Sequence, residues 1–186
     1  GLGDVYKRQL TATLSDSLVG NLKATDRSLI KASIGGTLTG DVSAIDSDII
    51  LTAGSVIGNL YAEDDSPASI TADVGNVTGS VTAVNTGAKI TLTADTVTGS
   101  LATLHGGTLT ASIANTFMGT TSDDSIEDLA TNDLVLNLAG GATWNLTDSS
   151  TVSTLNAEGG SVSLMDGRLG ETLTAGSFAG DGATLY

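Results

Sequence analysis

A seven-residue pattern recurs along the first part of the chain at a nearly constant step. It has the form [Val/Leu]-x-Gly-[Asn/Asp/Ser]-[Val/Leu]-x-[Ala/Thr]. Its five copies carry Gly20, Gly40, Gly58, Gly79 and Gly99, so the steps are 20, 18, 21 and 20 residues. A repeat of this length is typical of solenoids, in which each repeat is one turn of the chain and buries its apolar face only against its neighbours.

Each unit has the two-residue period of a β-strand with one buried face. In one copy Val77, Val81 and Ala83 alternate with Thr78 and Thr82, and such alternation predicts a half-buried strand. A second alternating segment follows each unit, and we expect these segments to end at Ala32, Ala53, Ala72, Ala94 and Ala111. The sequence therefore predicts an all-β parallel solenoid with rungs of about 20 residues and about eight rungs in all.

Stacking of the rungs assigns a role to two columns of residues. Equivalent positions in neighbouring rungs lie about 4.8 Å apart. The glycine column marks a position where a side chain has no room, at a bend or bulge in the strand. The Asn, Asp or Ser that follows each glycine is predicted to hydrogen-bond from rung to rung.

Composition and charge narrow the fold and its partners. The chain has 24 Gly, one Pro and only 3 % aromatic residues, which favours a thin core made of many similar layers. The formal net charge of -14, with seven basic residues, makes nucleic acid a poor partner. There is no cysteine, so the fold uses neither disulfides nor thiolate metal sites.

Three regions are distinguished along the chain. Residues 1–9 (GLGDVYKRQ) are similar to translated sequencing-adaptor sequence and stay outside the fold prediction. Residues 10–133 form the solenoid repeats, with a break in the step at 112–133 that we interpret as an irregular acidic loop near 120–130. Residues 134–186 form a last block of alternating strands separated by Gly-Gly and Asp-Ser-Ser turns.

The last block resembles the final passenger rungs of pertactin-like autotransporters. The resemblance lies in residues 136–156 (LNLAGGATWNLTDSSTVSTLN), with Trp144 in a GATWNLT frame, in Gly-Gly-Ser-Val-Ser-Leu at 159–164, and in the closing residues 173–185. It covers about the last 50 residues closely and the others only by repeat style. The family implies a right-handed parallel β-helix, exported through an outer-membrane β-barrel encoded downstream and tethered at the bacterial cell surface.

Two classes of function follow from these observations. The first is a structural stalk or adhesin, not an enzyme and without cofactors, whose outward Thr faces, including Thr78, Thr82, Thr91 and Thr93, contact a host glycan or surface protein. The alternative is a β-helical carbohydrate-active enzyme of the polysaccharide lyase or glycoside hydrolase type. That enzyme needs Asp, Glu, His, Arg or Lys residues from adjacent rungs gathered on one face. A β-roll scaffold that is not secreted is a further possibility.

Few residues stand out as chemical groups. Asp123, Asp124, Glu127 and Asp128 are weak candidates for a calcium site, because hard carboxylate oxygens gather there without the glycine-rich repeat of calcium-binding β-rolls. The single histidine, His105, lies in a Leu-His-Gly-Gly turn without an upstream carboxylate cluster, so we expect a surface turn residue. No Gly-x-Ser-x-Gly segment is present.

The aromatic residues suggest a gradient of stability. Trp144, Phe178 and Tyr186 lie in the last block, whereas the repeats from Leu18 to Ala111 contain only Tyr61. Large buried side chains contribute more than alanine does. The sequence therefore predicts that residues 134–186 are the most stable part of the chain and template the rungs before them.

Overall fold

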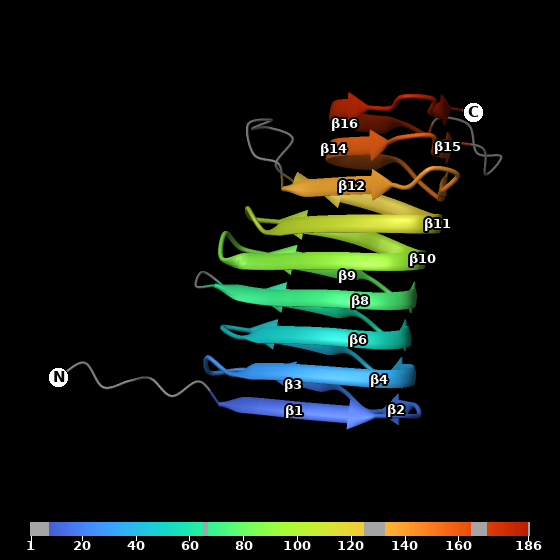
Figure 1. Ribbon diagram of the computed structural model, residues 1–186. Coiled ribbons are helices and arrows are strands. Elements are labelled where there is room, and N and C mark those ends of the chain that lie inside the picture. Colours follow the sequence, from blue (N-terminus) through green and yellow to red (C-terminus); the bar gives the residue numbers. More distant parts are fainter. Residues whose placement is uncertain (1–7, 65–66, 125–132, 165–170, 186) are drawn as a thin grey trace.

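The chain coils into a stack of flat β-rungs. The computed structural model describes residues 8–64, 67–124, 133–164 and 171–185. These residues form one 17-stranded sheet wound into about eight turns, with the first rung at one end of the stack and the last rung at the other (Figure 1). The prediction of an all-β parallel solenoid with rungs of about 20 residues is confirmed. Within the described part of the chain, no helix is long and apolar enough to cross a membrane.

The strands form two sets. The first set makes one continuous parallel face, in which each strand pairs with the next of its set. Its members are β1 (Gln9–Leu14), β4 (Leu29–Thr39), β6 (Asp48–Ile57), β8 (Ala68–Thr78), β10 (Ala88–Leu104), β11 (Thr108–Asp123), β12 (Leu134–Leu138), β14 (Ser150–Ala157) and β16 (Leu173–Ala179). The second set is shorter and comprises β2 (Leu18–Val19), β3 (Leu22–Ala24), β5 (Val42–Ile45), β7 (Leu60–Glu63), β9 (Val81–Val84), β13 (Thr143–Leu146), β15 (Ser161–Ser163) and β17 (Thr184–Leu185).

A middle rung consists of three segments separated by two corners. In β8 the first segment runs up to Val74, and the second, from Asn76 to Thr78, follows a corner at Gly75. Gly79 forms the next corner, and β9 is the third segment. The predicted strand end at Ala72 is therefore wrong, and so are its counterparts in the other rungs. The strand continues through the first corner into the seven-residue unit, because the corner bends the chain without ending the ladder of hydrogen bonds.

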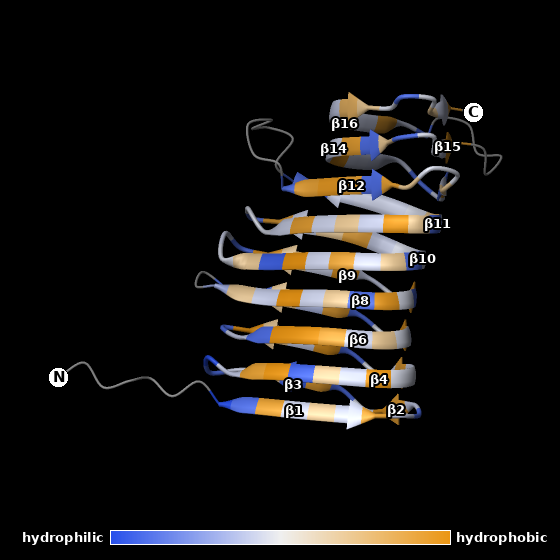
Figure 2. Cartoon of the chain, in the orientation of Figure 1, coloured by the Kyte–Doolittle hydropathy of each residue, from blue (hydrophilic) through white to orange (hydrophobic). Residues whose placement is uncertain are grey.

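The core is a set of columns of small and medium apolar side chains. Residues facing inward alternate with more exposed ones along the middle strands, as Figure 2 shows by its bands of apolar and polar residues. One column of isoleucines is Ile30, Ile49, Ile70 and Ile90, all buried. Burial of such a side chain contributes about 1.5 to 3 kcal/mol. Identical residues stack because the parallel register repeats the same environment in every rung.

The glycine column lies at the second corner, as predicted. Gly20, Gly40, Gly58, Gly79 and Gly99 have φ between 144° and 151°, a region that residues with a Cβ rarely adopt. From Gly40 onward, a Cβ at each of these glycines would collide with the carbonyl oxygen of the preceding glycine in the column. Close approach of the stacked backbones and positive φ therefore both require glycine.

The polar column beside the glycines forms the predicted ladder. The backbone N–H of Asp41 donates to Asn21 Oδ1 at 2.8 Å, and that of Asn59 donates to Asp41 Oδ1 at 2.8 Å. Ser80 N–H donates to Asn59 Oδ1 at 2.9 Å, and the Ser100 and Ser80 hydroxyls lie 2.9 Å apart. Each side chain thus links its rung to the next one at the corner where the strand ladder is interrupted.

The strand pairing continues past residue 112. β11 pairs with β10 up to Asp123, with one register shift between Ala94 and Thr96, and this places Phe117 beside Val97 and Gly119 beside Gly99. Residues 117–123 (FMGTTSD) are therefore a sixth copy of the unit with altered residues, and Gly119 has φ 156°. Residues 120–123, at the start of the predicted irregular acidic loop, belong to β11, whereas residues 125–132 lie outside the described part of the chain.

The repeat changes character at Trp144. Its ring stacks on Phe117, with centroids 5.3 Å apart, and its indole N–H donates to the Gly119 carbonyl oxygen at 3.1 Å. The next member of the glycine column is Leu146, which pairs with Gly119. Trp144 is fully buried, so the ring fills space in the core where the column of glycines ends.

Candidate functional site

A groove runs along the solenoid at the first corner of its rungs. It has a volume of about 800 Å³ and crosses six strands of the first set. One outward side chain from each strand lines it, and consecutive members of this column are register partners. The column is Thr52, Asp73, Thr93, Ser112, Asn137 and Asn156. The groove thus follows the solenoid axis and not a single strand.

Small residues at the first corner create the hollow. Gly75 and Ala114 line the groove and project little or nothing outward. A Cβ at Gly54 would lie 3.0 Å from the carbonyl oxygen of Gly36, so the corner is also tightly stacked from rung to rung. In each rung the small corner residue leaves a hollow beside the projecting polar side chain. Because successive rungs stack in register, these hollows join into one groove.

The groove presents hydrogen-bonding groups and negative charge. Asn156 Nδ2 donates to Asn137 Oδ1 at 2.7 Å, and Asn137 Nδ2 donates to Ser112 Oγ at 3.2 Å, which orients these amides along the axis. Asp73, Asp95 and Glu158 add three exposed carboxylates, and no basic residue lines the groove. The arrangement can accept hydrogen bonds from hydroxyl or amine groups and repels anions.

The two weak metal candidates that the structure describes, Asp123 and Asp124, differ in burial. Asp123 is 4 % exposed, and its carboxylate accepts hydrogen bonds from Thr103 Oγ1 at 3.2 Å and from Ser153 Oγ. Asp124 is exposed and accepts the backbone N–H of His105. Glu127 and Asp128 lie outside the described residues. Within the described ranges, no three His, Cys, Asp or Glu residues gather where they could hold a metal ion.

Asp123 belongs instead to a buried polar cluster. It occupies the last position of the sixth unit, in a column otherwise made of Ala24, Ala44, Ala62, Ala83 and Thr103. Ser153 Oγ also accepts the backbone N–H groups of Asp133 and Leu134, at 3.2 and 3.3 Å. These hydrogen bonds join β11, β12 and β14.

Other polar residues lie at the turns and on the third segment. His105 is exposed in the turn after β10, with φ 54°. Tyr61 borders a second hollow of about 440 Å³, and its hydroxyl donates to Glu63 Oε2 at 2.8 Å. Burial of the phenol raises the pKa of Tyr61, and the hydrogen bond to Glu63 and the negative charge of that carboxylate raise it further.

Among the predicted contact residues, only Thr93 lines the groove. Thr78 lies on the second segment, Thr82 lies on the third and Thr91 lies in the neighbouring column of the first. The sequence prediction missed Asp73, Asp95 and Glu158 because it compared the seven-residue units and not the corners between them. The sequence did carry a sign of the first corner. In successive rungs, Gly54, Gly75 and Asp95 each follow the inward residue of one column.

Comparison with known proteins gives no relative from which a function could be transferred. No family model, no curated protein and no solved structure matches the chain.

Proposed function

We propose that the chain is part of the secreted passenger of a bacterial autotransporter, a right-handed β-helix that serves as a structural stalk or adhesin at the cell surface. Two features support this proposal. The first is the solenoid architecture, which builds length by repetition. The second is the resemblance of residues 136–164 to pertactin-like passenger rungs, including the Trp144 frame. In the full-length protein, a cognate outer-membrane β-barrel is its export partner.

The adhesive surface in this proposal is the axial groove. Its ligand is a neutral or amine-bearing host glycan in extended form, because the groove crosses six strands and offers amides, hydroxyls and three carboxylates. An anionic glycan meets unfavourable charge there, in a chain that already carries -14. The polar groove that crosses successive rungs is the single observation that carries the proposal of glycan binding.

Glycan binding in the groove is tested by calorimetry, which measures the affinity of the chain for neutral and amine-bearing oligosaccharides. Thr93→Arg is the variant that blocks the groove. Thr93 lies in the middle of the groove and is exposed, so a long side chain obstructs the path of the ligand. Thr98→Arg is the matched control, since Thr98 is exposed on the same strand but lies beyond the corner. We expect Thr93→Arg to weaken binding at least about tenfold and Thr98→Arg to leave it unchanged. Equal loss in both variants would contradict the groove as the binding surface.

The autotransporter origin has its own test. A fusion of residues 10–186 to an autotransporter barrel in a Gram-negative host is expected to reach the cell surface, where protease added to intact cells cleaves it. Sequencing of the gene beyond both ends is expected to give a signal peptide upstream and a barrel downstream. A fusion that remains protected from protease, together with neighbouring sequence that encodes no barrel, would contradict the proposal.

A β-helical glycoside hydrolase is the second candidate. One observation favours it: Asp73 and Asp95 come from adjacent rungs and line the same groove, and glycosidases use paired carboxylates. This enzyme would cleave a neutral polysaccharide and would lose turnover in both Asp73→Asn and Asp95→Asn. Binding without release of reducing ends would favour the adhesin, and turnover abolished by both substitutions would favour the hydrolase.

A further inference from the structure

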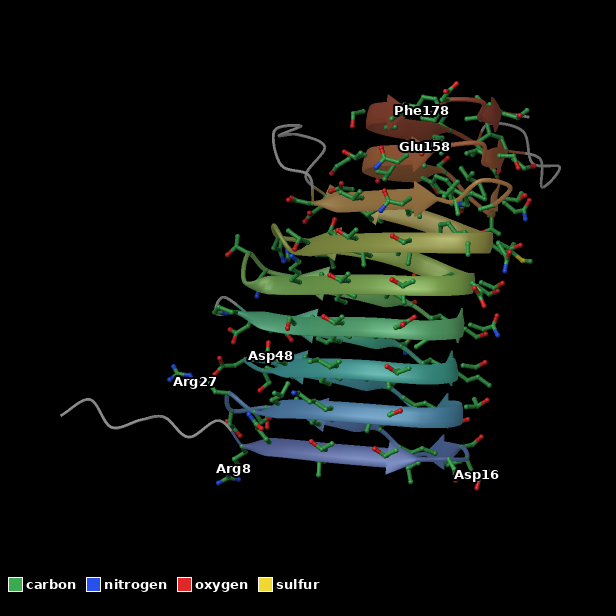
Figure 3. The ribbon with its side chains drawn as sticks, in the orientation of Figure 1. Arg8, Asp16, Arg27, Asp48, Glu158 and Phe178 are labelled. Atoms are coloured by element: carbon green, nitrogen blue, oxygen red, sulfur yellow. The ribbon has the colours of Figure 1, made fainter. Side chains whose placement is uncertain are left out.

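A second hollow lies on the third segment of the inner rungs, apart from the axial groove. It has a volume of about 440 Å³, and its lining residues lie on or next to β5, β7 and β9, which belong to three successive rungs. The axial groove lies at the first corner instead, and one of its lining residues, Glu158, lies beside β14 in Figure 3. Among the described residues, none lines both hollows, so the third segment offers a separate surface.

A large ring between short side chains shapes this hollow. Tyr61 on β7 pairs with Ser43 on β5 and with Thr82 on β9. All three side chains are half-buried and point outward, since the residues that alternate with them along each strand are buried. Because both partners are short, the ring has open space beside it along the solenoid axis.

The ring of Tyr61 is held along its strand. Its hydroxyl donates to Glu63 Oε2 at 2.8 Å, and Glu63 lies two residues further on the same face of β7. In the described residues before β12, the other aromatic side chain is Phe117, which is buried in the core. Tyr61 is therefore the aromatic ring that this part of the solenoid presents on its surface.

The side chains at the neighbouring corner form a polar wall with fixed hydrogen-bond directions. Asp41 Oδ1 accepts the backbone N–H of Asn59 at 2.8 Å and Asn59 Nδ2 at 3.1 Å. Asn59 Oδ1 in turn accepts the backbone N–H of Ser80 at 2.9 Å. Neither bond of Asp41 uses Oδ2, and both Asp41 and Asn59 are exposed. The hollow thus combines an aromatic ring with an oriented amide and a carboxylate oxygen.

We propose that this hollow binds one ring of a neutral sugar, stacked on Tyr61 and hydrogen-bonded to Asp41 and Asn59. A pyranose ring has an apolar C–H face and a rim of hydroxyl groups. The apolar face fits an aromatic ring, and the hydroxyl rim fits side chains that present donors and acceptors at fixed positions. The volume of about 440 Å³ lies within the usual range of small-ligand pockets. The site goes beyond the adhesive groove and does not depend on it.

The charge of the lining favours a neutral ligand. Among the described residues, Asp41 is the one charged residue that borders the hollow, and the whole chain carries -14, so an anionic sugar is repelled. Ammonium ligands are bound in cages of several aromatic rings, whereas this hollow has the single ring of Tyr61. A neutral sugar uses the ring and the polar wall together.

Two-dimensional NMR of the 186-residue chain tests the proposal, because the amide signals report where a ligand binds. The probes are the neutral disaccharides cellobiose, lactose and maltose, with glucosamine and glucuronic acid as charged comparisons. Tyr61→Ser removes the ring and Asp41→Ser removes the carboxylate. Serine already occurs in both columns, at Ser43 and Ser80, so both variants should fold. Tyr61→Thr repeats the test if circular dichroism shows that Tyr61→Ser is unfolded, since Thr82 occupies the same column.

Ile57→Ser is the matched control for loss of an exposed large side chain. Ile57 is 50 % exposed in the same rung as Tyr61, but it lies on the second segment and outside the hollow. We expect at least one neutral disaccharide to shift the amide signals of Asn59, Tyr61 and Thr82 in the wild type and in Ile57→Ser. Tyr61→Ser should weaken this binding at least about tenfold, and Tyr61→Trp should retain it because the larger ring keeps the stacking face.

Asp41→Ser should also weaken binding, because the sugar loses a hydrogen-bond acceptor and the Asn59 amide loses its orientation. Shifts confined to Thr93 and its neighbours would support the axial groove and overturn this second site. Binding of glucosamine alone, no shift on the third segment with any neutral disaccharide, or equal loss in Tyr61→Ser and Ile57→Ser would overturn it as well.

Discussion

At the scale of single residues, two different reasons require glycine in the glycine column: a positive φ and the close approach of the neighbouring rung. The sequence alone does not distinguish them. Gly20 and Gly79 share nearly the same backbone conformation, with φ of 144° and 148°. They differ in their neighbours, since a Cβ at Gly79 would collide with the Gly58 carbonyl oxygen and a Cβ at Gly20 would meet nothing within 4 Å. The pair therefore distinguishes backbone strain from close approach.

We predict that Gly79→Val lowers the free energy of unfolding by about 2 kcal/mol or more, because strain and collision act together. Gly20→Val should cost only the strain, about 1 to 2 kcal/mol. Thr78→Val should change stability by less than about 0.5 kcal/mol, because this side chain faces solvent. Chemical denaturation of the three variants provides the measurement. Equal losses for Gly20→Val and Gly79→Val would show that stacking adds nothing.

Tyr61 gives a prediction for alkaline pH. Its pKa is raised above the ordinary value of 10.0, so the phenol stays protonated to higher pH in the folded chain than in the unfolded one. Its contribution to stability is therefore complete below about pH 10 and is lost as pH rises through the folded-state pKa. Absorbance of the phenolate, taken as the difference between wild type and Tyr61→Phe, should show this late titration. Glu63→Gln should lower the pKa, and an unchanged titration would exclude the role of the Glu63 charge.

At the scale of structural elements, the buried polar cluster holds β11, β12 and β14 together. Asp123 accepts hydrogen bonds from Thr103, its neighbour in the column, and from Ser153, whereas the four earlier units have alanine at this position. Burial of a carboxylate is unfavourable unless the carboxylate is fully hydrogen-bonded. The Asp123 carboxylate therefore needs the two hydroxyl donors, and the buried hydroxyls need the carboxylate as acceptor. The cluster thus connects the regular repeats to the last block.

We predict that Asp123→Ala destabilises the chain by about 1 to 3 kcal/mol, because buried hydroxyls lose their acceptor. Thr103→Ala should do the same to a smaller extent. The double variant restores the alanine of the earlier rungs at both positions, and its loss should be smaller than the sum of the single losses. Thermal denaturation of the four proteins measures this coupling. Additive losses would mean that Thr103 and Asp123 act independently.

At the scale of the whole molecule, the expected gradient of stability needs revision. The argument for a stable last block relied on Trp144, Phe178 and Tyr186. Trp144 is fully buried against Phe117, but Phe178 is mostly exposed and Tyr186 lies outside the described residues. β16 is exposed or half-buried at every position, as β1 is. The best-packed region therefore lies in the middle of the stack.

Hydrogen exchange of the 186-residue chain should show protection highest in β8, β10 and β11 and lowest in β1 and β16. In a one-dimensional array, each end rung has a neighbour on one side only, so it opens at lower cost than an inner rung. Protection that rises steadily from β1 to β16 would instead restore the gradient expected from the aromatic residues.

The sequence by itself determined the repeat, the parallel stacking and the glycine and polar columns. These follow from local rules, because a two-residue period fixes the buried face and a constant step of about 20 residues fixes which positions stack. The sixth unit escaped recognition because four consensus positions are altered, although Gly119 keeps its place. The altered residues are Phe117, Thr120, Thr121 and Asp123. A pattern of residue types cannot show that an altered rung still continues the register.

Only the tertiary structure decided where the corners lie, and with them the groove, and how far Phe178 is buried. Thr91 and Thr93 look equivalent in sequence, yet only Thr93 borders the groove, because a corner begins two residues later. Phe178 looks like a core residue, yet it is exposed because β16 has a neighbour on only one side within the described chain. Burial at the end of a stack depends on what is placed next to it, and the alternation of residues along a strand carries no information about that neighbour.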